Sequence, residues 1–517
     1  MLELRNAAWG APADQRWIFY PAVITIHAVR VPSPSMRLFP IVHLCSVLLI
    51  LYSVSMFGPI LINVAYEDGD FNGFFTTFVL AFSIGITGWQ LTRRGNTKLS
   101  SRDGFLVVVL FWLVFSVVSA LPFVLDNSVK ASVADAFFES ISGITTTGGT
   151  IMPHVDNLPH AILFYRAQLN FLGGLGIIVL ALAILPLLGV GGSKLYQSES
   201  VGPLREDKLS PRLADTAKQL WMVYSGLALA AALSFKVAGL NWFDSFCYSL
   251  STVALGGFAT HDAGLGFYNN LWVEVVAGVF SFLSGINFAL YYRLTIARSV
   301  MPLFKDPELK AYALIALGVA AFTIIELWRC GRFPMIECIV HGFFQSMSVM
   351  TDNGLTTADY PNWPAHIAIF LMLSSYIGGC VGSTCGGIKV MRVLLCYRQT
   401  HQEIKQLIHT NGIFPTKINT HIVSDRMMQS VWSFAFLYIF ISVVFVVALM
   451  MCGNDIQTAF GTVSACINNM GIGYGDTAVN FAGLTDTAKW LMCAAMLLGR
   501  LEVFPILVMF SRTYWRF

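Results

Sequence analysis

The motif FFESISGITTTGGT, at residues 137–150, decides the fold because the chain repeats it. It returns as FFQSMSVMTDNGLT at 343–356. Two more divergent copies read FCYSLSTVALGGFA at 246–259 and FGTVSACINNMGIG at 460–473. Each copy is a short apolar segment followed by a loop that contains glycine and, in most copies, threonine or asparagine. Recurrence roughly every hundred residues indicates a repeat architecture.

The composition places the chain in a membrane. It has 517 residues, of which 56% are hydrophobic and only 12% charged, whereas soluble domains average about 25% charged residues. Lipid cannot hydrogen-bond the backbone, so stretches long enough to cross it are expected to be helices. Such stretches lie at 41–64, 74–91, 105–125, 162–190, 213–238, 271–294, 311–327, 365–396, 431–451 and 490–510.

Each motif copy lies between two of these stretches. An apolar segment of about 10–14 residues is too short to span, and it is expected to re-enter the membrane beside a watery cavity. The predicted fold is an all-α polytopic membrane protein, with two leading helices and four helix–pore loop–helix repeats around a central ion pore. The predicted divisions are an N-terminal extension at 1–35, leading helices at 36–103, repeats at 104–192, 193–300, 301–398 and 427–517, and a cytoplasmic linker at 399–426.

The residue types of the loops suit a cation. A short helix that ends at the loop directs its negative dipole end toward the axis. Loop carbonyls can replace the hydration shell of an ion, and glycine permits the backbone angles that turn them inward. Thr145, Thr146 and Thr147 add hydroxyl oxygens without full charge. Acids near the starts of the segments suit the positive helix ends: Asp135, Asp244, Glu337 and Asp455.

With these motifs, the sequence from Met36 onward resembles the TrkH subunits of bacterial Trk potassium uptake systems, which are related to KtrB. TTTG at 145–148, ALGGF at 254–258, NGLTT at 353–357 and NNMGIG at 468–473 stand where that family places its filter loops. The resemblance implies the filter glycines Gly148, Gly256, Gly354 and Gly471. It implies potassium, the transported ion, at Thr146, Thr147, Gly148, Leu255, Gly256, Asn353, Gly354, Met470 and Gly471.

Two features of the loops stay open. The tetrapeptide GYGD at 473–476 resembles the potassium-channel signature and offers a second register for the fourth loop. Asp352 departs from an all-neutral filter, and its carboxylate either strengthens the local field or faces outward.

The second span of the third repeat contains the run GGCVGSTCGG at 378–387. Glycine costs a helix about 1 kcal/mol against alanine, so this run is expected to break the span. It resembles the intramembrane gating loop of the family. Arg500 lies at comparable depth in the fourth repeat. An arginine within the membrane is energetically costly, so its presence there indicates a functional role. The predicted gate consists of Arg500, Gly378, Gly379, Gly382, Gly386 and Gly387.

Other polar and small residues in the spans have simpler interpretations. The alternative role for Arg500 is structural: an interhelical salt bridge that only fixes packing. Arg166 and His341 are expected to be structural polar groups at span ends. The small residues at 172–176 and 283–286 are expected to serve close helix packing.

Lysine and arginine concentrate at both ends of the chain and in 92–103, 191–218, 292–310 and 389–428, which predicts cytoplasmic termini. The resemblance implies a multi-pass protein of the bacterial inner membrane, a homodimer of complete pores, and a cytosolic TrkA-like nucleotide-binding regulatory subunit. No cofactor and no nucleic-acid partner are expected on this chain. It is not expected to be an enzyme, because no catalytic constellation stands out.

Two other functions remain as alternatives. A proton- or sodium-coupled secondary transporter of another cation or solute would usually show inverted repeats, whereas these four run in the same sequence sense. A membrane scaffold without transport would leave the four loops unexplained.

The first 35 residues contain neither a motif copy nor a spanning stretch, and Met36 precedes a long apolar run. The extension is therefore expected to be untranslated or an unstructured cytoplasmic tail. A chain that begins at Met36 is expected to insert and transport as the full chain does, measured as rubidium uptake at matched membrane level. Loss of insertion or uptake would show that the extension matters.

Overall fold

The computed structural model describes residues 38–93, 101–179 except 127 and 130, 209–357 except 298 and 300, and 360–515 except 411, 413, 419 and 420. The predicted extension at 1–35 and the end of the predicted span at 162–190 lie outside these residues. The described chain is mainly helical. Its strands are β1 (Lys417–Ile418) and β2 (His421–Ile422), which pair antiparallel. The predicted all-α class is confirmed.

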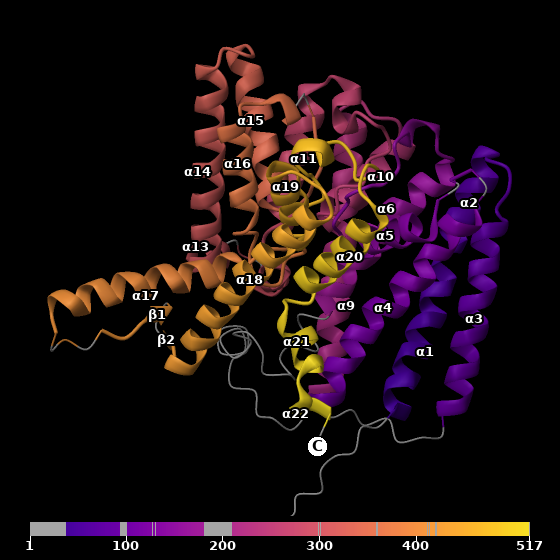
Figure 1. Cartoon of the computed structure of the whole chain (residues 1–517), viewed down its shortest axis with the longest axis horizontal. Coiled ribbons are helices and arrows are strands. Elements are labelled where there is room, and N and C mark those ends of the chain that lie inside the picture. Colours follow the sequence, from indigo (N-terminus) through magenta and orange to yellow (C-terminus); the bar gives the residue numbers. More distant parts are fainter. Residues whose placement is uncertain are drawn as a thin grey trace, which may run out of the picture. The chain divides into compact units, whose positions relative to one another are not determined.

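Two helical segments precede the first motif copy. One is broken into α1 (Leu38–Ser55) and α2 (Phe57–Tyr66), and the other is α3 (Asn72–Thr92). Figure 1 shows α1 and α3 side by side, and both contact the next helix, α4 (Ser101–Leu125). Within the described residues, 6 helices are long and apolar enough to cross a membrane, or up to 8 if each bent pair counts as one span.

Each motif copy forms a short helix between two others. The first set is α4, α5 (Val133–Ile144) and α6 (His160–Val179), and the second is α9 (Leu209–Val237), α10 (Trp242–Ala254) and α11 (Leu271–Ser284). The third is α14 (Pro307–Arg329), α15 (Met335–Met350) and α16 (Ala365–Ser375), and the fourth is α18 (Asp425–Met451), α19 (Ile456–Ile467) and α20 (Asp486–Arg500).

The connections contain shorter elements. A 3₁₀ turn follows each of the four loops: η1 (Val155–Asn157), η3 (Gly264–Tyr268), η4 (Tyr360–Asn362) and η5 (Gly475–Thr477). The remaining helices are α12 (Phe288–Ala297), α13 (Met301–Lys305), α17 (Val390–Ile408), α21 (Phe504–Phe510) and α22 (Arg512–Trp515).

Three of the four short helices begin at a side-chain cap, whereas α15 follows Pro334, which makes no side-chain cap bond. The Ser132 hydroxyl accepts a bond from the Asp135 N–H at 3.1 Å, and Asn241 caps α10 in the same way. Asp455 caps α19 directly, and its carboxylate accepts the N–H of Gln457 at 3.0 Å. Side-chain caps satisfy N–H groups that the first helical turn leaves free, and acids there oppose the positive helix end.

Two spans that were predicted to be continuous are broken. The stretch 271–294 divides into α11 and α12 with a bend of 87°, and 490–510 divides into α20 and α21 with a bend of 112°. Glu502 and Val503 take left-handed angles at the second break. At the first, the side-chain Oδ1 of Asn287 accepts the Ala289 N–H at 2.9 Å at the start of α12. Apolar composition did not reveal these local caps and turns.

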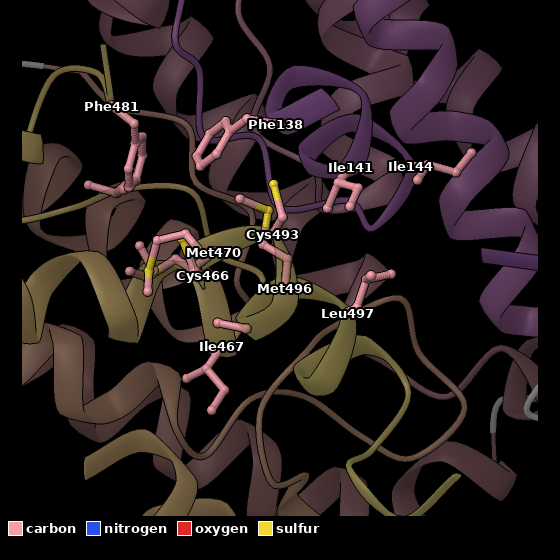
Figure 2. Close-up of a cluster of buried hydrophobic side chains, with 14 of the residues drawn as sticks. Phe138, Ile141, Ile144, Cys466, Ile467, Met470, Phe481, Cys493, Met496 and Leu497 are labelled. Atoms are coloured by element: carbon pink, nitrogen blue, oxygen red, sulfur yellow. The ribbon is translucent and has the colours of Figure 1, made fainter. Parts of the chain in front are cut away.

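The four sets close into a ring. Each short helix contacts the last helix of the preceding set: α10 contacts α6, α15 contacts α11, α19 contacts α16, and α5 contacts α20. Figure 2 shows the closing seam, where apolar side chains of α5, such as Phe138 and Ile141, gather with Cys466, Met470 and Met496 of the fourth set. All five side chains are fully buried. The loops that end the short helices therefore meet around a common centre.

Candidate functional site

The four loops share one backbone conformation. A non-glycine residue with left-handed φ lies one or two positions after the end of each short helix: Thr146, Leu255, Asp352 and Asn469, at 53°, 55°, 61° and 57°. Two residues later comes a glycine with φ near the upper end of that region: Gly148, Gly257, Gly354 and Gly471, at 75°, 73°, 76° and 79°. An L side chain at these angles is strained, so the glycines are required.

In the second loop this conformation corrects the predicted register by one residue. The glycine equivalent to Gly148 is Gly257, not Gly256. Gly256 instead takes the place of Thr147, and the N–H of each bonds a carbonyl five residues back, at 2.9 and 2.8 Å. The adjacent glycines offer two frames, and the motif comparison chose the wrong one.

In the fourth loop the shared conformation belongs to Gly471. Gly473 and Gly475 are the other candidates from the GYGD tetrapeptide. They pack instead against Thr477 and Thr458 of their own repeat. The backbone therefore repeats at Gly471.

The four glycines bring the loops into direct backbone contact. A Cβ atom on Gly148 would lie 1.8 Å from the Gly256 carbonyl oxygen, and one on Gly257 would lie 2.4 Å from that of Asn353. A Cβ on Gly354 would lie 1.9 Å from the Met470 oxygen, and the Gly471 Cβ would lie 2.1 Å from the Thr147 oxygen, which closes the ring. We call this arrangement the carbonyl ring, defined by the carbonyls of Thr147, Gly256, Asn353 and Met470.

Two glycines of the flanking helices support the ring. A Cβ on Gly173 of α6 would lie 2.0 Å from the carbonyl oxygen of Ile144, the last residue of α5. Gly499 of α20 holds the same relation to Ile467 of α19, at 1.8 Å. Small residues of the spans were predicted to serve close helix packing, and at these two glycines the close contact is with a helix end. They admit the last carbonyl of each short helix.

Side chains also join the loops to neighbouring parts of the chain: Asn469 reaches the first loop, and Asn353 reaches α11. Asn469 donates from Nδ2 to the Thr147 hydroxyl at 3.0 Å, and Asn353 donates to the Ser281 hydroxyl at 2.7 Å.

Outside the loops, His261 bonds Asp156 at 2.7 Å and Asp244 at 3.3 Å. Burial lowers the pKa of His261, but the hydrogen bonds with Asp244 and Asp156 outweigh it and raise the pKa overall.

A buried ion pair lies behind the first loop. Arg166 donates from Nε to Glu139 at 2.8 Å and from Nη1 to the Ala259 carbonyl at 2.9 Å. Glu139 also accepts the N–H of Ile151 at 3.0 Å and the hydroxyl of Thr150. Arg166 was predicted to be a structural polar group at a span end. It is structural in a precise place, because it ties the segments after the first and second loops together.

Arg166→Gln is expected to destabilise the protein strongly, because Glu139 would remain buried without its partner. Breaking such a pair costs about 3–5 kcal/mol. The measurement is the temperature at which detergent-solubilised protein loses its single elution peak. Arg329→Gln is the matched control, since Arg329 is 67% exposed beside Glu326 and exposed pairs contribute about 0–1 kcal/mol. Equal transition temperatures for the two variants would contradict the bracing role.

The glycine-rich run lies in a non-helical loop between α16 and α17, at 376–389, which we call the glycine loop. Gly378, Gly382 and Gly387 have left-handed φ. A Cβ on Gly386 would lie 1.8 Å from the Asn468 carbonyl oxygen, so the loop packs directly against the fourth repeat. The predicted break in this span is present.

Arg500 reaches the glycine loop. The side chain is 3% exposed, and its Nη1 donates to the Thr384 carbonyl at 2.9 Å. The structure thus brings together two features that lie far apart in the sequence. Among the described residues Arg500 has no ion pair, whereas its neighbour Glu502 pairs with Arg392.

Three charged residues of this region were not singled out by sequence reasoning, or were left open. The buried Lys389 takes a left-handed φ of 81° and donates to the Cys385 carbonyl within the loop. Glu308 accepts the Val381 N–H at 2.7 Å. Asp352 is fully buried and faces the loop, since a Cβ on Gly378 would lie 3.5 Å from its Oδ2. The available signal was a charge at the end of the predicted span for Lys389 and a charge in an otherwise neutral loop for Asp352; Glu308 lies in the polar connection 292–310 and gave no such signal.

Comparison with known proteins finds relatives that match most of the chain. A family model described as a cation transport protein, TrkH, matches residues 71–516. The Trk system potassium uptake protein TrkG of Escherichia coli K12 is 49% identical over 92% of this chain and 98% of its own length. TrkH of the same strain is 42% identical over 92% and 99%. The crystal structure of the potassium transporter TrkH from Vibrio parahaemolyticus superposes with a TM-score of 0.86 at 39% identity, covering 93% of this chain and 100% of that one.

Proposed function

The chain belongs to the TrkH family of cation transport proteins, which are transporters rather than enzymes, and we propose that it takes up potassium through the carbonyl ring. The observation that carries this proposal is the direct contact of four loop backbones in a closed cycle. Carbonyl oxygens held in this way can replace the hydration shell of K⁺. The carboxyl ends of four short helices add a negative field at the same place.

The filter residues follow from that geometry. Gly148, Gly257, Gly354 and Gly471 supply the conformation, and the residue before each supplies the ring carbonyl. Thr146 adds a hydroxyl oxygen that has no hydrogen-bond partner among the described residues. The proposed ion-binding set is Thr146, Thr147, Gly148, Leu255, Gly256, Gly257, Asn353, Gly354, Met470 and Gly471.

The proposed gate is the glycine loop together with Arg500. The loop lies against the third and fourth repeats, next to the residues that end α15 and α19. The Arg500 charge near the ring opposes a passing cation, and its bond to Thr384 holds the loop in place. Gly378, Gly379, Gly382, Gly386 and Gly387 give the loop its turns and close contacts.

The setting is proposed from the relatives and from the charge pattern. We propose a cytosolic, TrkA-like nucleotide-binding subunit as the partner; the names of the relatives, which are proteins of a Trk system, support an assembly with other subunits. We place the chain in the bacterial inner membrane with both termini in the cytoplasm, because lysine and arginine concentrate at the ends and in alternate connections. A homodimer of complete pores remains a proposal from the family resemblance.

The test is rubidium uptake by cells that lack their own potassium transporters, with the regulator co-expressed. Uptake that K⁺ inhibits, and that Na⁺ inhibits far less, is expected. The alternative of a proton- or sodium-coupled transporter for another solute is examined by collapsing the pH gradient or removing Na⁺ at a fixed membrane potential. Absence of rubidium uptake at verified membrane level would contradict the proposal.

A further inference from the structure

One buried carboxyl group reaches the glycine loop from a helix that has no part in the filter or the gate as proposed. Glu308 lies in the first turn of α14, with 4% of its surface exposed. Its Oε1 accepts the Val381 N–H of the loop at 2.7 Å. The first helix of the third repeat is thus bonded directly to the loop that follows the last helix of the same repeat.

The donor belongs to a tight turn at the tip of the glycine loop, residues 380–383. The Ser383 N–H bonds the Cys380 carbonyl at 3.2 Å, and Gly382 has a left-handed φ of 79°. These are the features of a type II turn, in which Val381 takes the first corner. The hydrogen bond of the turn does not use the N–H of that corner, so this N–H requires a partner elsewhere. Glu308 supplies the partner.

The remaining bonds of the tip run to the break between α11 and α12. The Cys380 N–H bonds the Gly285 carbonyl at 2.9 Å, and the Gly382 carbonyl accepts the Phe288 N–H at 3.1 Å. Both bonds join backbone to backbone, so substitution of a side chain elsewhere leaves them in place. The bond to Glu308 can therefore be removed without removing these two.

Two side chains hold the loop from different repeats. Arg500 of α20 donates to the Thr384 carbonyl, and Glu308 of α14 accepts from Val381, three residues earlier in the loop. A buried donor that loses its acceptor is unfavourable, so the Val381 N–H would seek water or another acceptor without Glu308. Loss of Glu308 is therefore expected to favour movement of the tip away from α14.

We propose that Glu308 is a positioning residue of the gate, a latch that holds the tip of the glycine loop against α14. A carboxyl oxygen accepts the Val381 N–H whether or not the group is protonated, so the latch requires an acceptor and no charge. Passage of a cation past the loop requires the tip to leave Glu308. The latch rests on the proposed function, in which the glycine loop is the gate.

The glycine loop contains its own reporters for a test. Cys380 and Cys385 are buried there, and Cys247 of α10 and Cys466 of α19, which are buried too, serve as references. The purified full chain is treated with N-ethylmaleimide, and alkylation is measured peptide by peptide. In Glu308→Ala, alkylation of the two loop cysteines is expected to be several-fold faster than in the unaltered chain. In Glu308→Gln it should stay near the original rate, because an amide oxygen accepts the same N–H.

Val381→Pro removes the donor instead of the acceptor. Proline has no N–H, and it suits the first corner of a type II turn. It should speed alkylation as Glu308→Ala does, and the double variant should be no faster than either, because both changes delete one bond. The matched control is Asp425→Ala, which removes an exposed acid from the first turn of α18, the helix that opens the fourth repeat. It should leave the loop cysteines at their original rate.

Transport gives a second reading. Glu308→Ala and Val381→Pro should raise rubidium uptake without the regulator several-fold at matched membrane level, with selection of Rb⁺ over Na⁺ retained. Unchanged alkylation of the loop cysteines in Glu308→Ala would overturn the latch, as would equally fast alkylation in Glu308→Gln. Faster alkylation of Cys247 and Cys466 as well would also overturn it, because Glu308 would then stabilise the whole fold.

The two proposals fail in different ways. Faster alkylation of the loop cysteines with unchanged uptake would overturn the latch, because the tip would then not limit flux. Absence of rubidium uptake by the unaltered chain would contradict the proposed function itself. The alkylation needs no transport, so it still shows whether Glu308 holds the loop.

Discussion

Gly354→Ser is expected to lose discrimination between K⁺ and Na⁺, with rubidium uptake falling about tenfold or more. The residue has a φ of 76°, and a Cβ would lie 1.9 Å from the Met470 carbonyl oxygen. A side chain at such angles costs about 1–2 kcal/mol, and about 1.4 kcal/mol is a factor of ten. The clash also displaces one ring carbonyl. Gly148→Ser should act alike, because its Cβ would lie 1.8 Å from the Gly256 oxygen.

The measurement is the uptake of rubidium and of sodium at equal membrane level. Gly318→Ser is the matched control, since Gly318 lies in α14 with nothing within 4 Å of a built Cβ. The control should transport normally. Native selection of K⁺ over Na⁺ in both Gly148→Ser and Gly354→Ser would remove the filter assignment.

The second loop allows a test of register with the same assay. Gly257→Ala should impair selection, because Gly257 has left-handed φ and meets the Asn353 carbonyl oxygen. Gly256→Ala should impair selection less, because Gly256 does not have a left-handed φ and its Cβ would displace the buried side chain of Asn170, at 2.4 Å, rather than a ring carbonyl. The reverse order of severity would restore the register that the motif comparison first favoured.

Arg500→Ala is expected to raise flux and to weaken dependence on the cytosolic regulator. The change removes the bond to Thr384 and a positive charge near the ring. It also removes an arginine whose insertion near mid-membrane costs about 2.5–3.5 kcal/mol, so loss of folding is not the expected outcome. Deleting part of 382–386 should act in the same direction, because it shortens the loop that Arg500 holds.

Uptake is measured for each variant with and without the regulator, at matched expression. Arg500→Lys keeps the charge and one donor, and an intermediate flux is expected from it. If Arg500→Ala only lowers expression, or if flux falls while regulator dependence is unchanged, Arg500 is a structural residue and the gate lies elsewhere.

The spans and the four short helices were predictable because apolar length and the repeated motif are properties of sequence alone. The register of the second loop was predictable too, although by a different signal. Each left-handed glycine lies eleven residues after the phenylalanine that opens its motif copy, and this spacing selects Gly257 after Phe246. The short loop sequences by themselves do not distinguish Gly256 from Gly257, and the spacing from the phenylalanine was not used.

Other parts of the site were not predictable, for physical reasons. The partner of Arg500 is a backbone carbonyl, which every residue has, so no residue type indicates Thr384. Besides their local caps and turns, both bends have contacts with distant segments: the Cys380 N–H bonds the Gly285 carbonyl at 2.9 Å after α11, and Glu502 pairs with Arg392 after α20. Tertiary contacts of this kind override apolar composition.

The carbonyl ring is formed by one continuous chain, and this has a consequence for symmetry. A pore made of four identical subunits shows every substitution four times, so one new carboxylate becomes four that repel one another. Here each quadrant of the ring comes from a different repeat of the same chain, so its residues can change without changes in the other three. A single acid, Asp352, therefore occurs in one quadrant while Thr146, Leu255 and Asn469 keep the other three neutral. Because the four quadrants of the proposed pore belong to one chain, they are distinguishable, and each can take a different role.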